Sequence, residues 1–295
     1  MKNILTLYDL TKEELENLID RSVEIFHQIN QKNLKPKRDL KGKISLIYFE
    51  KPSTRTRISF DSAIRRLGGE VIFVSPSETQ ISRGEDKRDF IKVVSGYIDL
   101  IIARVYDHRT LETFAENIEK PIINALSDLS HPTQIISDLA TIKLLTGDYI
   151  NKRICFLGDA KNNVARSWIE AQKVLGTFEL IFSTPNGLEP EEKGNYKLET
   201  DPVKALIDSD ILYLDVWFSM GQEHDEEKYK KLLPYALDDS KLSLLSGKFV
   251  FHCLPAKKGE EISHKIFSMH ENTIYTQAHM KLPSAISIIE NLDIS

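Results

Sequence analysis

The alternation of short apolar runs with segments of helical periodicity is the feature that most constrains the fold. Residues 44–49 are rich in β-branched and aromatic side chains, which favour a buried strand. Apolar residues then recur at helical spacing from residue 58 to residue 67. The pattern repeats in both halves of the chain. It predicts an α/β fold with two doubly wound parallel-sheet domains joined by helices.

The boundaries of the predicted elements follow from this periodicity. Thr11 and Glu14 form a capping box at the start of the first helix. The polar residues 75–85 predict an exposed loop. The predicted strands are residues 44–49, 71–74, 99–104, 121–125, 153–158, 178–182, 211–214 and 249–253. The predicted helices are residues 11–29, 58–67, 90–97, 131–145, 164–175, 203–207, 227–235 and 282–292.

Composition excludes several classes of protein. A chain of 295 residues is long enough for two domains, and its 41% hydrophobic and 28% charged residues are typical of soluble globular proteins. The net charge of −5 does not support nucleic-acid binding, so any anion site must be a local basic cluster. We expect the domain junction along or just after the helix 131–145.

The cysteine count and the N-terminus bear on the compartment. Two cysteines, Cys155 and Cys253, are too few for a disulfide framework and fit a reducing environment. The N-terminal residues become acidic too soon for a signal peptide, and no apolar run approaches about 18 residues. We therefore expect a cytoplasmic protein without membrane contact; a processed chain imported into an organelle is the alternative.

The polar turn of residues 53–57 separates the first predicted strand from its helix. Backbone N–H groups at a helix start can bind an anion, and three hydroxyl and two guanidinium groups add donors suited to phosphate. The alternative is a capped surface helix with solvated arginines. From the residues alone, both interpretations stay open.

The turn Ser53-Thr54-Arg55-Thr56-Arg57 resembles the carbamoyl-phosphate signature of the aspartate/ornithine carbamoyltransferase family. Four further stretches resemble that family in the expected order and span nearly the whole chain. They are Arg104 at the end of a strand, His131-Pro132-Thr133-Gln134, the run DVWFSMG from Asp215 to Gly221, and His252-Cys253-Leu254-Pro255.

For the first half, the resemblance implies a carbamoyl-phosphate site. Ser53, Thr54, Arg55 and Thr56 would hold the phosphate. Arg104, His131 and Thr56 would donate hydrogen bonds to the carbonyl oxygen, where negative charge develops during attack by an amine. Gln134 would bind the carbamoyl amino group.

Two more residues of the first domain enter through the resemblance. The counterpart of the loop 75–85 enters the neighbouring subunit's site in this family, so Gln80 would reach carbamoyl phosphate there. Such shared sites imply a homotrimer or a multiple of trimers. Lys281 takes the place of an arginine that helps hold carbamoyl phosphate. The C-terminal helix, 281–295, would pack on residues 1–137 as the carbamoyl-phosphate domain, leaving 138–280 as the amino-acid domain.

For the second half, the resemblance implies a site for ornithine. Asn163 would hold the α-carboxylate, while Asp215 and Ser219 suit an α-ammonium group. Met220 and Leu254 complete the expected ornithine-binding set with Cys253, which lies against the side-chain amine. Asp215 and Cys253 join Arg55, Thr56, Arg104 and His131 as the expected catalytic residues.

The resemblance is closest to the ornithine branch, which transfers the carbamoyl group to the side-chain amine of L-ornithine without a metal or organic cofactor. The alternatives are another amine acceptor, such as putrescine or an acylated ornithine, and aspartate. Arg83-Gly84-Glu85 and Thr133 resemble the aspartate branch. A non-catalytic relative that binds anions or a partner is an alternative of another class. The sequence does not distinguish a biosynthetic from a catabolic role.

Overall fold

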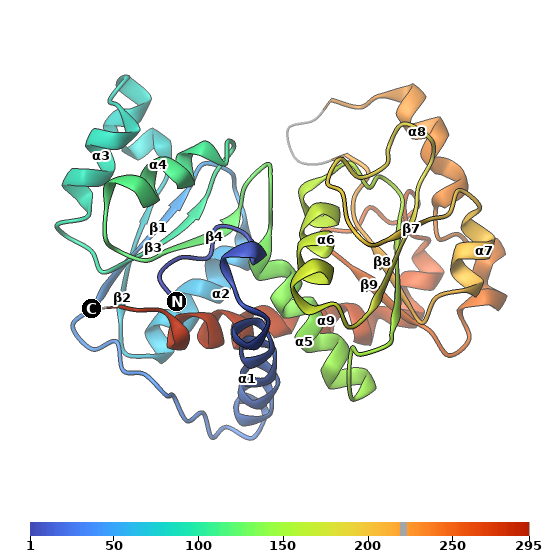
Figure 1. Ribbon diagram of the computed structural model, residues 1–295, viewed down its shortest axis with the longest axis horizontal. Helices are drawn as coiled ribbons and strands as arrows, with labels where there is room; N and C mark the ends of the chain where they lie inside the picture. Colours follow the sequence, from blue (N-terminus) through green and yellow to red (C-terminus); the bar gives the residue numbers. More distant parts are fainter. Residues whose placement is uncertain (219–222, 295) are drawn as a thin grey trace. The chain divides into compact units, whose positions relative to one another are not determined.

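A computed structural model describes residues 1–218 and 223–294 of the chain (Figure 1). The chain divides into two compact units, Met1–Leu145 with the C-terminal segment from His279, and Thr146–Ala278. The second division falls inside the last helix, α9 (His264–Asn291). The predicted domain bounds at 137/138 and 280/281 stay predictions about the functional domains.

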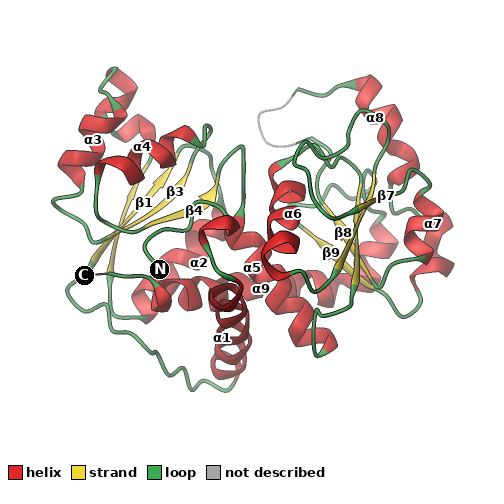
Figure 2. Cartoon of the chain, in the orientation of Figure 1, coloured by secondary structure: helices red, strands yellow, loops and turns green. Residues whose placement is uncertain are grey.

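The first unit is built on a four-stranded parallel sheet with the order β2-β1-β3-β4. Helices α3 and α4 lie on one side of this sheet and α2 on the other (Figure 2). The strands are β1 (Ile44–Phe49), β2 (Glu70–Val74), β3 (Leu100–Arg104) and β4 (Ile122–Leu126). The helices are α1 (Lys12–Asn30), α2 (Thr54–Arg66), α3 (Lys87–Val94), α4 (Arg109–Asn117) and α5 (Pro132–Thr146).

Aromatic packing fixes α3 and α4 to the sheet of the first unit. The Tyr48 ring of β1 lies with its centroid 5.7 Å from that of Phe90 on α3 and 5.8 Å from that of Phe114 on α4. All three side chains are buried. On the other face, α2 buries Phe60 and Ile64. Successive strand residues point to opposite faces, so a sheet covered on both sides needs the continuous apolar strands seen in the sequence.

The second unit contains a five-stranded parallel sheet with the order β7-β6-β5-β8-β9. The strands are β5 (Arg153–Leu157), β6 (Glu179–Ser183), β7 (Lys197–Leu198), β8 (Ile211–Leu214) and β9 (Phe249–His252). The helices are α6 (Asn163–Leu175), α7 (Pro202–Ile207), α8 (Glu226–Leu232) and the first part of α9.

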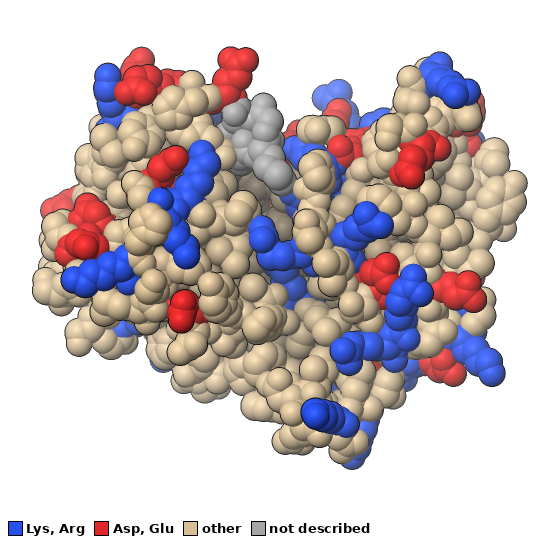
Figure 3. Space-filling model, turned by 180° about the vertical axis from the view of Figure 1, so that it is seen from behind, with Lys and Arg blue, Asp and Glu red and all other residues tan. Residues whose placement is uncertain are grey.

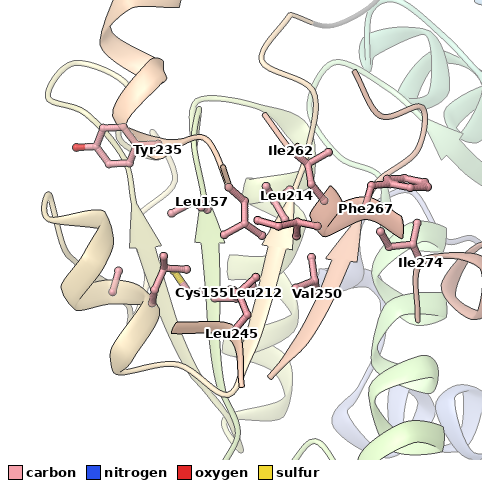
Figure 4. Close-up of a cluster of buried hydrophobic side chains, with 14 of the residues drawn as sticks. Cys155, Leu157, Leu212, Leu214, Tyr235, Leu245, Val250, Ile262, Phe267 and Ile274 are labelled. Carbon is pink, nitrogen blue, oxygen red and sulfur yellow. The ribbon is translucent and has the colours of Figure 1, made fainter. Parts of the chain in front are cut away.

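Alternate strand residues build two cores around this second sheet. On one face Cys155, Leu212 and Val250 belong to a buried cluster that includes Phe267 and Ile274 of α9 (Figure 4). On the other face the Tyr213 ring lies 5.3 Å from that of Trp168 on α6, centroid to centroid, in an edge-on contact. The two parallel sheets with their helices confirm the predicted fold class.

Two local predictions were wrong, and a third segment has additional local structure. The last helix begins at His264 rather than near residue 282, because Pro283, which resembles a helix start, lies inside it. Helix α4 was missed, since its Thr-rich sequence buries only Thr110, Leu111 and Phe114. The loop 75–85 contains two 3-10 helices, Pro76–Glu78 and Gln80–Arg83. The other 3-10 helices are Leu7–Asp9, Leu233–Tyr235 and Asp239–Leu245.

A buried ion pair holds the C-terminal part of α9 to α1. Arg21 donates from Nε to Glu290 Oε2 at 2.7 Å and from Nη2 to Glu290 Oε1 at 3.0 Å. Their side chains are 4% and 1% exposed. Because removing one partner leaves the other charge buried, we expect Glu290→Gln to lower the free energy of unfolding by about 3 kcal/mol. Urea unfolding measures this difference.

The control is the exposed pair Lys2–Glu119, whose ions are 2.9 Å apart. We expect Lys2→Met to change the free energy of unfolding by less than about 1 kcal/mol. Equal effects of the two substitutions would show that the Arg21–Glu290 pair does not anchor the helix.

Candidate functional site

The strand order of the first unit creates a crevice between β1 and β3. From β1 the chain moves outward to β2 on one side and then to β3 on the other. The last residues of the two strands, Phe49 and Arg104, are register partners. In open parallel sheets, ligands bind outside the carboxyl ends of the strands at such a switch point. The polar turn that follows β1 therefore lies at the expected ligand edge.

The polar turn forms the first turn of α2. Ser53 is the N-cap residue, and within the described structure its side chain accepts no hydrogen bond from the helix start. The first helical backbone bond runs from Arg57 N to Ser53 O at 3.1 Å, so the N–H groups of Thr54–Thr56 precede the helical ladder. Arg55 is exposed and Thr56 is buried. Such a turn can hold an oxyanion.

The Arg57 side chain stacks on an aromatic ring next to the polar turn. Its guanidinium carbon lies 3.5 Å from the centroid of the Phe73 ring on β2. A planar guanidinium stacks well on an aromatic face. Of the two arginines in the turn, Arg57 thus packs on a ring, and the role of Arg55 in the site stays a prediction.

Cationic groups gather at the ends of β3 and β4. Arg104 ends β3, and His131 directly precedes α5; both are buried. Burial holds the pKa of His131 well below its usual range, and the nearby charges of Lys281 and Arg104 lower it further. His131 is therefore a neutral imidazole that can donate one hydrogen bond. Its Nδ1 lies 3.4 Å from Thr133 Oγ1.

Gln134 and Lys281 join this group. Lys281 on α9 donates from Nζ to Gln134 Oε1. The first unit thus brings His131, Gln134, Lys281 and Arg104 together. Their roles in binding carbamoyl phosphate stay predictions. Gln80 is exposed, and its Oε1 accepts a hydrogen bond from Arg83 Nη1 at 3.5 Å. Its role in a neighbouring subunit stays a prediction.

The sequence analysis missed Lys51 and Glu50. Lys51 Nζ lies 4.6 Å from the centroid of the Tyr106 ring, and burial together with the charge of Arg104 lowers the Lys51 pKa. The Glu50 carboxylate accepts hydrogen bonds from Tyr106 N and Lys87 Nζ. In the sequence, these two residues stand between the end of a predicted strand and the polar turn. This position could have marked them as candidate site residues.

A cavity of about 900 Å³ opens beside the polar turn. Ser53, Thr54 and Arg57 line one part of it, and Phe73 and Tyr106 line another. The cavity thus lies mainly at the ends of β1 and β2, and the residues that line it do not include Arg104, His131 or Lys281.

The second unit has a switch point of its own, between β5 and β8. The last residues of these strands, Leu157 and Leu214, are register partners. After β5, Asn162 caps α6 by accepting a hydrogen bond from Ala165 N at 2.8 Å. Asn162 is thus the helix cap, and Asn163 is the first residue of the helix.

Asp215 and Cys253 follow the neighbouring strands β8 and β9. Cys253 N donates to Leu214 O at 2.9 Å, which sets the two residues beside one strand end. Asp215 is half-buried and accepts a hydrogen bond from Val216 N at 2.8 Å. Leu254 packs against the core cluster of this unit. The predicted residues Ser219 and Met220 lie outside the described residues.

An ion pair braces the turn that leads to Asn163. Asp159 is buried, and its Oδ2 lies 2.6 Å from Lys228 Nζ on α8. Its Oδ1 accepts a hydrogen bond from Lys161 N. Both oxygens are therefore engaged in holding the turn, which makes Asp159 a structural residue here.

The two cysteines differ in environment, and within the described structure neither forms a disulfide. Burial raises the pKa of the Cys155 thiol to about 12, so it stays protonated in the core, as predicted. Cys253 is half-buried at the end of β9. Only Cys253 thus occupies a strand-end position at which ligands bind in parallel sheets.

The described residues contain neither a candidate metal site nor a membrane-spanning helix. No described group of three or more His, Cys, Asp or Glu side chains could hold a metal ion. No described helix is both long and apolar enough to cross a membrane. On the face shown in Figure 3, basic and acidic side chains are interspersed among broad uncharged areas. This distribution differs from the basic stripe expected of a nucleic-acid-binding surface.

Comparison with protein families assigns both halves of the chain. Residues 2–144 match the carbamoyl-phosphate-binding domain of aspartate/ornithine carbamoyltransferases. Residues 151–292 match the aspartate/ornithine-binding domain of the same family. Each matched range contains one of the two parallel sheets described above, together with its switch point.

Individual relatives extend this similarity over the full length. The anabolic ornithine carbamoyltransferase of Pyrococcus furiosus is 37% identical over 303 residues, covering 98% of this chain and 95% of the relative. The ornithine carbamoyltransferase of Methanocaldococcus jannaschii is 38% identical, with 95% of each chain covered. A solved structure of the Pyrococcus furiosus enzyme superposes with a TM-score of 0.89, at 34% identity and with 99% and 96% of the chains covered.

The buried, neutral His131 has a measurable consequence for stability. The pKa of His131 is lowered in the folded state. In mild acid, His131 therefore binds a proton in the unfolded chain but stays neutral in the folded chain. The contribution of His131 to stability is therefore complete above about pH 6.5 and falls as the pH drops, by up to about 1.4 kcal/mol per pH unit.

Urea unfolding between pH 8 and pH 5 tests this effect. We expect His131→Gln to lose less stability over this range than the wild type does. The comparison removes the contribution of every other titrating group. Parallel pH profiles of the two proteins would contradict a neutral, buried His131.

Proposed function

The chain belongs to the aspartate/ornithine carbamoyltransferase family, and we propose that it is an ornithine carbamoyltransferase. It transfers the carbamoyl group of carbamoyl phosphate to the side-chain amine of L-ornithine, giving L-citrulline and phosphate. One observation carries this proposal. In each unit polar side chains follow the carboxyl ends of adjacent parallel strands. Hydroxyl and basic groups in the first unit support anion binding, and Asn163 and Asp215 in the second unit support amino-acid binding.

In the first unit, the polar turn binds the phosphate group. The N–H groups and hydroxyls of Ser53, Thr54 and Thr56, with the guanidinium of Arg55, supply its donors. Attack on the carbonyl carbon builds negative charge on the carbonyl oxygen. Arg104, His131 and Thr56 stabilise that charge, and a neutral His131 suits this role because it donates a hydrogen bond without needing to be protonated.

Two further residues complete the carbamoyl-phosphate half. Gln134 binds the carbamoyl amino group, and Lys281 adds a positive charge beside it. Gln80 acts from a neighbouring subunit. A lysine contacts phosphate as a point charge, without the bidentate geometry of an arginine.

In the second unit, the residues after β5, β8 and β9 bind ornithine. The Asn163 amide holds the α-carboxylate, and the Asp215 carboxylate attracts the α-ammonium group. Ser219 and Met220 belong to the same set. Cys253 and Leu254 lie against the side-chain amine, which must lose its proton to attack. The amine is the nucleophile, so the reaction needs neither a covalent thiol intermediate nor a metal or organic cofactor.

We extend the proposal to assembly and cellular role. The exposed segment around Gln80 suits insertion into a neighbouring site, which supports a homotrimer or a multiple of trimers with shared active sites. Two cysteines without a disulfide support the cytoplasm as the compartment. Similarity to an enzyme named anabolic supports a role in arginine biosynthesis.

The proposal predicts a narrow choice of amine. In an end-point assay for ureido product with carbamoyl phosphate, we expect product from L-ornithine and none from L-aspartate, putrescine, N-acetyl-L-ornithine or L-lysine. Product from aspartate alone would favour the branch that Thr133 and Arg83-Gly84-Glu85 resemble. Product from another amine would contradict the roles given to Asn163 and Asp215, and no product from any of them would contradict the proposed reaction.

The polar turn offers a matched pair of arginine variants. We expect Arg55→Ala to lower kcat/KM by about 100-fold or more, because it removes a charged donor from the site of developing charge. Arg57→Ala serves as the control, since Arg57 packs on Phe73; we expect a change below about tenfold. Steady-state assays measure both effects. Equal losses would remove the distinction between the two arginines.

A further inference from the structure

We propose that Asp138 and Lys281 together fix the orientation of the Gln134 side chain, and that this arrangement selects the amino group of carbamoyl phosphate. In this inference Asp138 is a positioning residue that acts through Gln134. It rests on the proposed function, because it concerns how the same site recognises its phosphate substrate. It adds Asp138, which the sequence analysis did not identify, to the residues that serve the reaction.

The three side chains form a continuous hydrogen-bonded series. Gln134 donates from Nε2 to Asp138 Oδ1 at 2.8 Å, one helical turn away on α5. Its Oε1 accepts a hydrogen bond from Lys281 Nζ. Asp138 is fully buried, Gln134 is 2% exposed, and Lys281 is half-buried. The amide is therefore held at both ends, with its polar contacts shielded from water.

The chemistry of the two neighbours dictates which way the amide points. An ammonium group only donates hydrogen bonds, and an ionised carboxylate only accepts them. A flipped Gln134 would set its NH2 group against Lys281 and its oxygen against Asp138, which would be unfavourable at both ends. The orientation thus follows from charge type, and neither neighbour alone would enforce it as strictly.

This orientation creates a specific acceptor. A carboxamide oxygen has two lone pairs, and Lys281 uses one of them. The other can accept an N–H from a ligand beside His131, whose backbone oxygen accepts a hydrogen bond from Gln134 N at 3.1 Å. The carboxylate of Asp138 polarises the amide and strengthens its oxygen as an acceptor. A methyl group in place of the carbamoyl NH2 would leave that lone pair without a donor.

The burial of Asp138 supports a role beyond packing. Residues 132–142 of α5 are buried on all sides of the helix. A carboxylate is expensive to hold in such surroundings and must be matched by hydrogen bonds and positive charge. An apolar residue would pack there at lower cost. Setting the Gln134 amide is a function that an apolar residue could not perform.

Acetyl phosphate provides the probe, since it keeps the phosphate and the carbonyl group but carries a methyl group where carbamoyl phosphate has NH2. The quantity to measure is the selectivity ratio, the inhibition constant of acetyl phosphate divided by the KM of carbamoyl phosphate. A general loss of anion affinity cancels in this ratio. The loss of one hydrogen bond to the amino group does not.

For Asp138→Asn, we expect the selectivity ratio to fall about fivefold or more, as the loss of one hydrogen bond would produce. The carboxamide that replaces the carboxylate can present either its oxygen or its nitrogen, so it no longer sets the orientation of Gln134. The control on the same helix is Lys143→Met, which removes a surface partner of Asp20. We expect it to leave the ratio unchanged. An unchanged ratio in Asp138→Asn would overturn the inference.

Two further comparisons test the inference, and the first of them does not depend on whether Asp138→Asn folds. Lys281→Met should lower the ratio, and Lys281→Arg, which retains a donor for Oε1, should keep it near the wild-type value. In a Gln134→Met background, Asp138→Asn should cause no further fall, because Asp138 acts through Gln134. An additional fall there, or an equal ratio in both Lys281 variants, would contradict the inference.

The same experiment separates this inference from the proposed function. A wild-type protein that neither uses carbamoyl phosphate nor binds acetyl phosphate would contradict the proposed function. A wild type that uses carbamoyl phosphate but binds both phosphates equally well would overturn only the positioning role of Asp138.

Discussion

The parallel pairing of β1 with β3 and of β5 with β8 is the constraint on which both halves of the site depend. In each pair the chain leaves the two strands in opposite directions, so no connecting segment covers their carboxyl ends. Phe49 and Arg104 are register partners, so the polar turn 53–57 follows the strand beside the one that ends with the buried Arg104. Leu157 and Leu214 are also register partners, so the segments that contain Asn163 and Asp215 follow neighbouring strands. A slip of one residue in either pair would turn every strand side chain to the other face.

The two units carry charges of opposite sign at their strand ends. The first unit collects Arg104, Lys281 and Lys51, and His131 avoids adding a further charge because its pKa is lowered. Positive charges that lie close together repel each other. Binding of the proposed phosphate would therefore reduce the repulsion among these side chains and add new contacts. The second unit instead places the half-buried carboxylate of Asp215 at its strand end. This contrast is the one that the proposed substrates require, an anionic phosphate in the first unit and an α-ammonium group in the second.

The sequence predicted the parts of this site that lie on strong local patterns. The strand before Ser53, the cap of the first helix at Thr11 and the group around His131 were all visible, because apolar periodicity and turn chemistry are local. Lys51 and Asp138 were not, since a single charge in a strand turn or a helix is ordinarily solvated. Lys51 lies over the ring of Tyr106, and Asp138 is linked to Lys281 only through Gln134; Tyr106 and Lys281 are both distant in sequence from these partners. Pro283 misled the prediction of α9, because tertiary packing tolerates a proline that local preference would place at a helix start.

Helix α9 connects stability with chemistry in the first unit. Glu290 fixes its C-terminal part against Arg21 on α1 through two hydrogen bonds. Lys281 lies on the same helix and donates a hydrogen bond to Gln134 on α5. A lysine has a long, flexible side chain, so the direction of its ammonium group depends on where its backbone is held. The helix is thus attached to the first unit at both of these points, and of the two only the contact of Lys281 involves residues that are proposed to bind substrate.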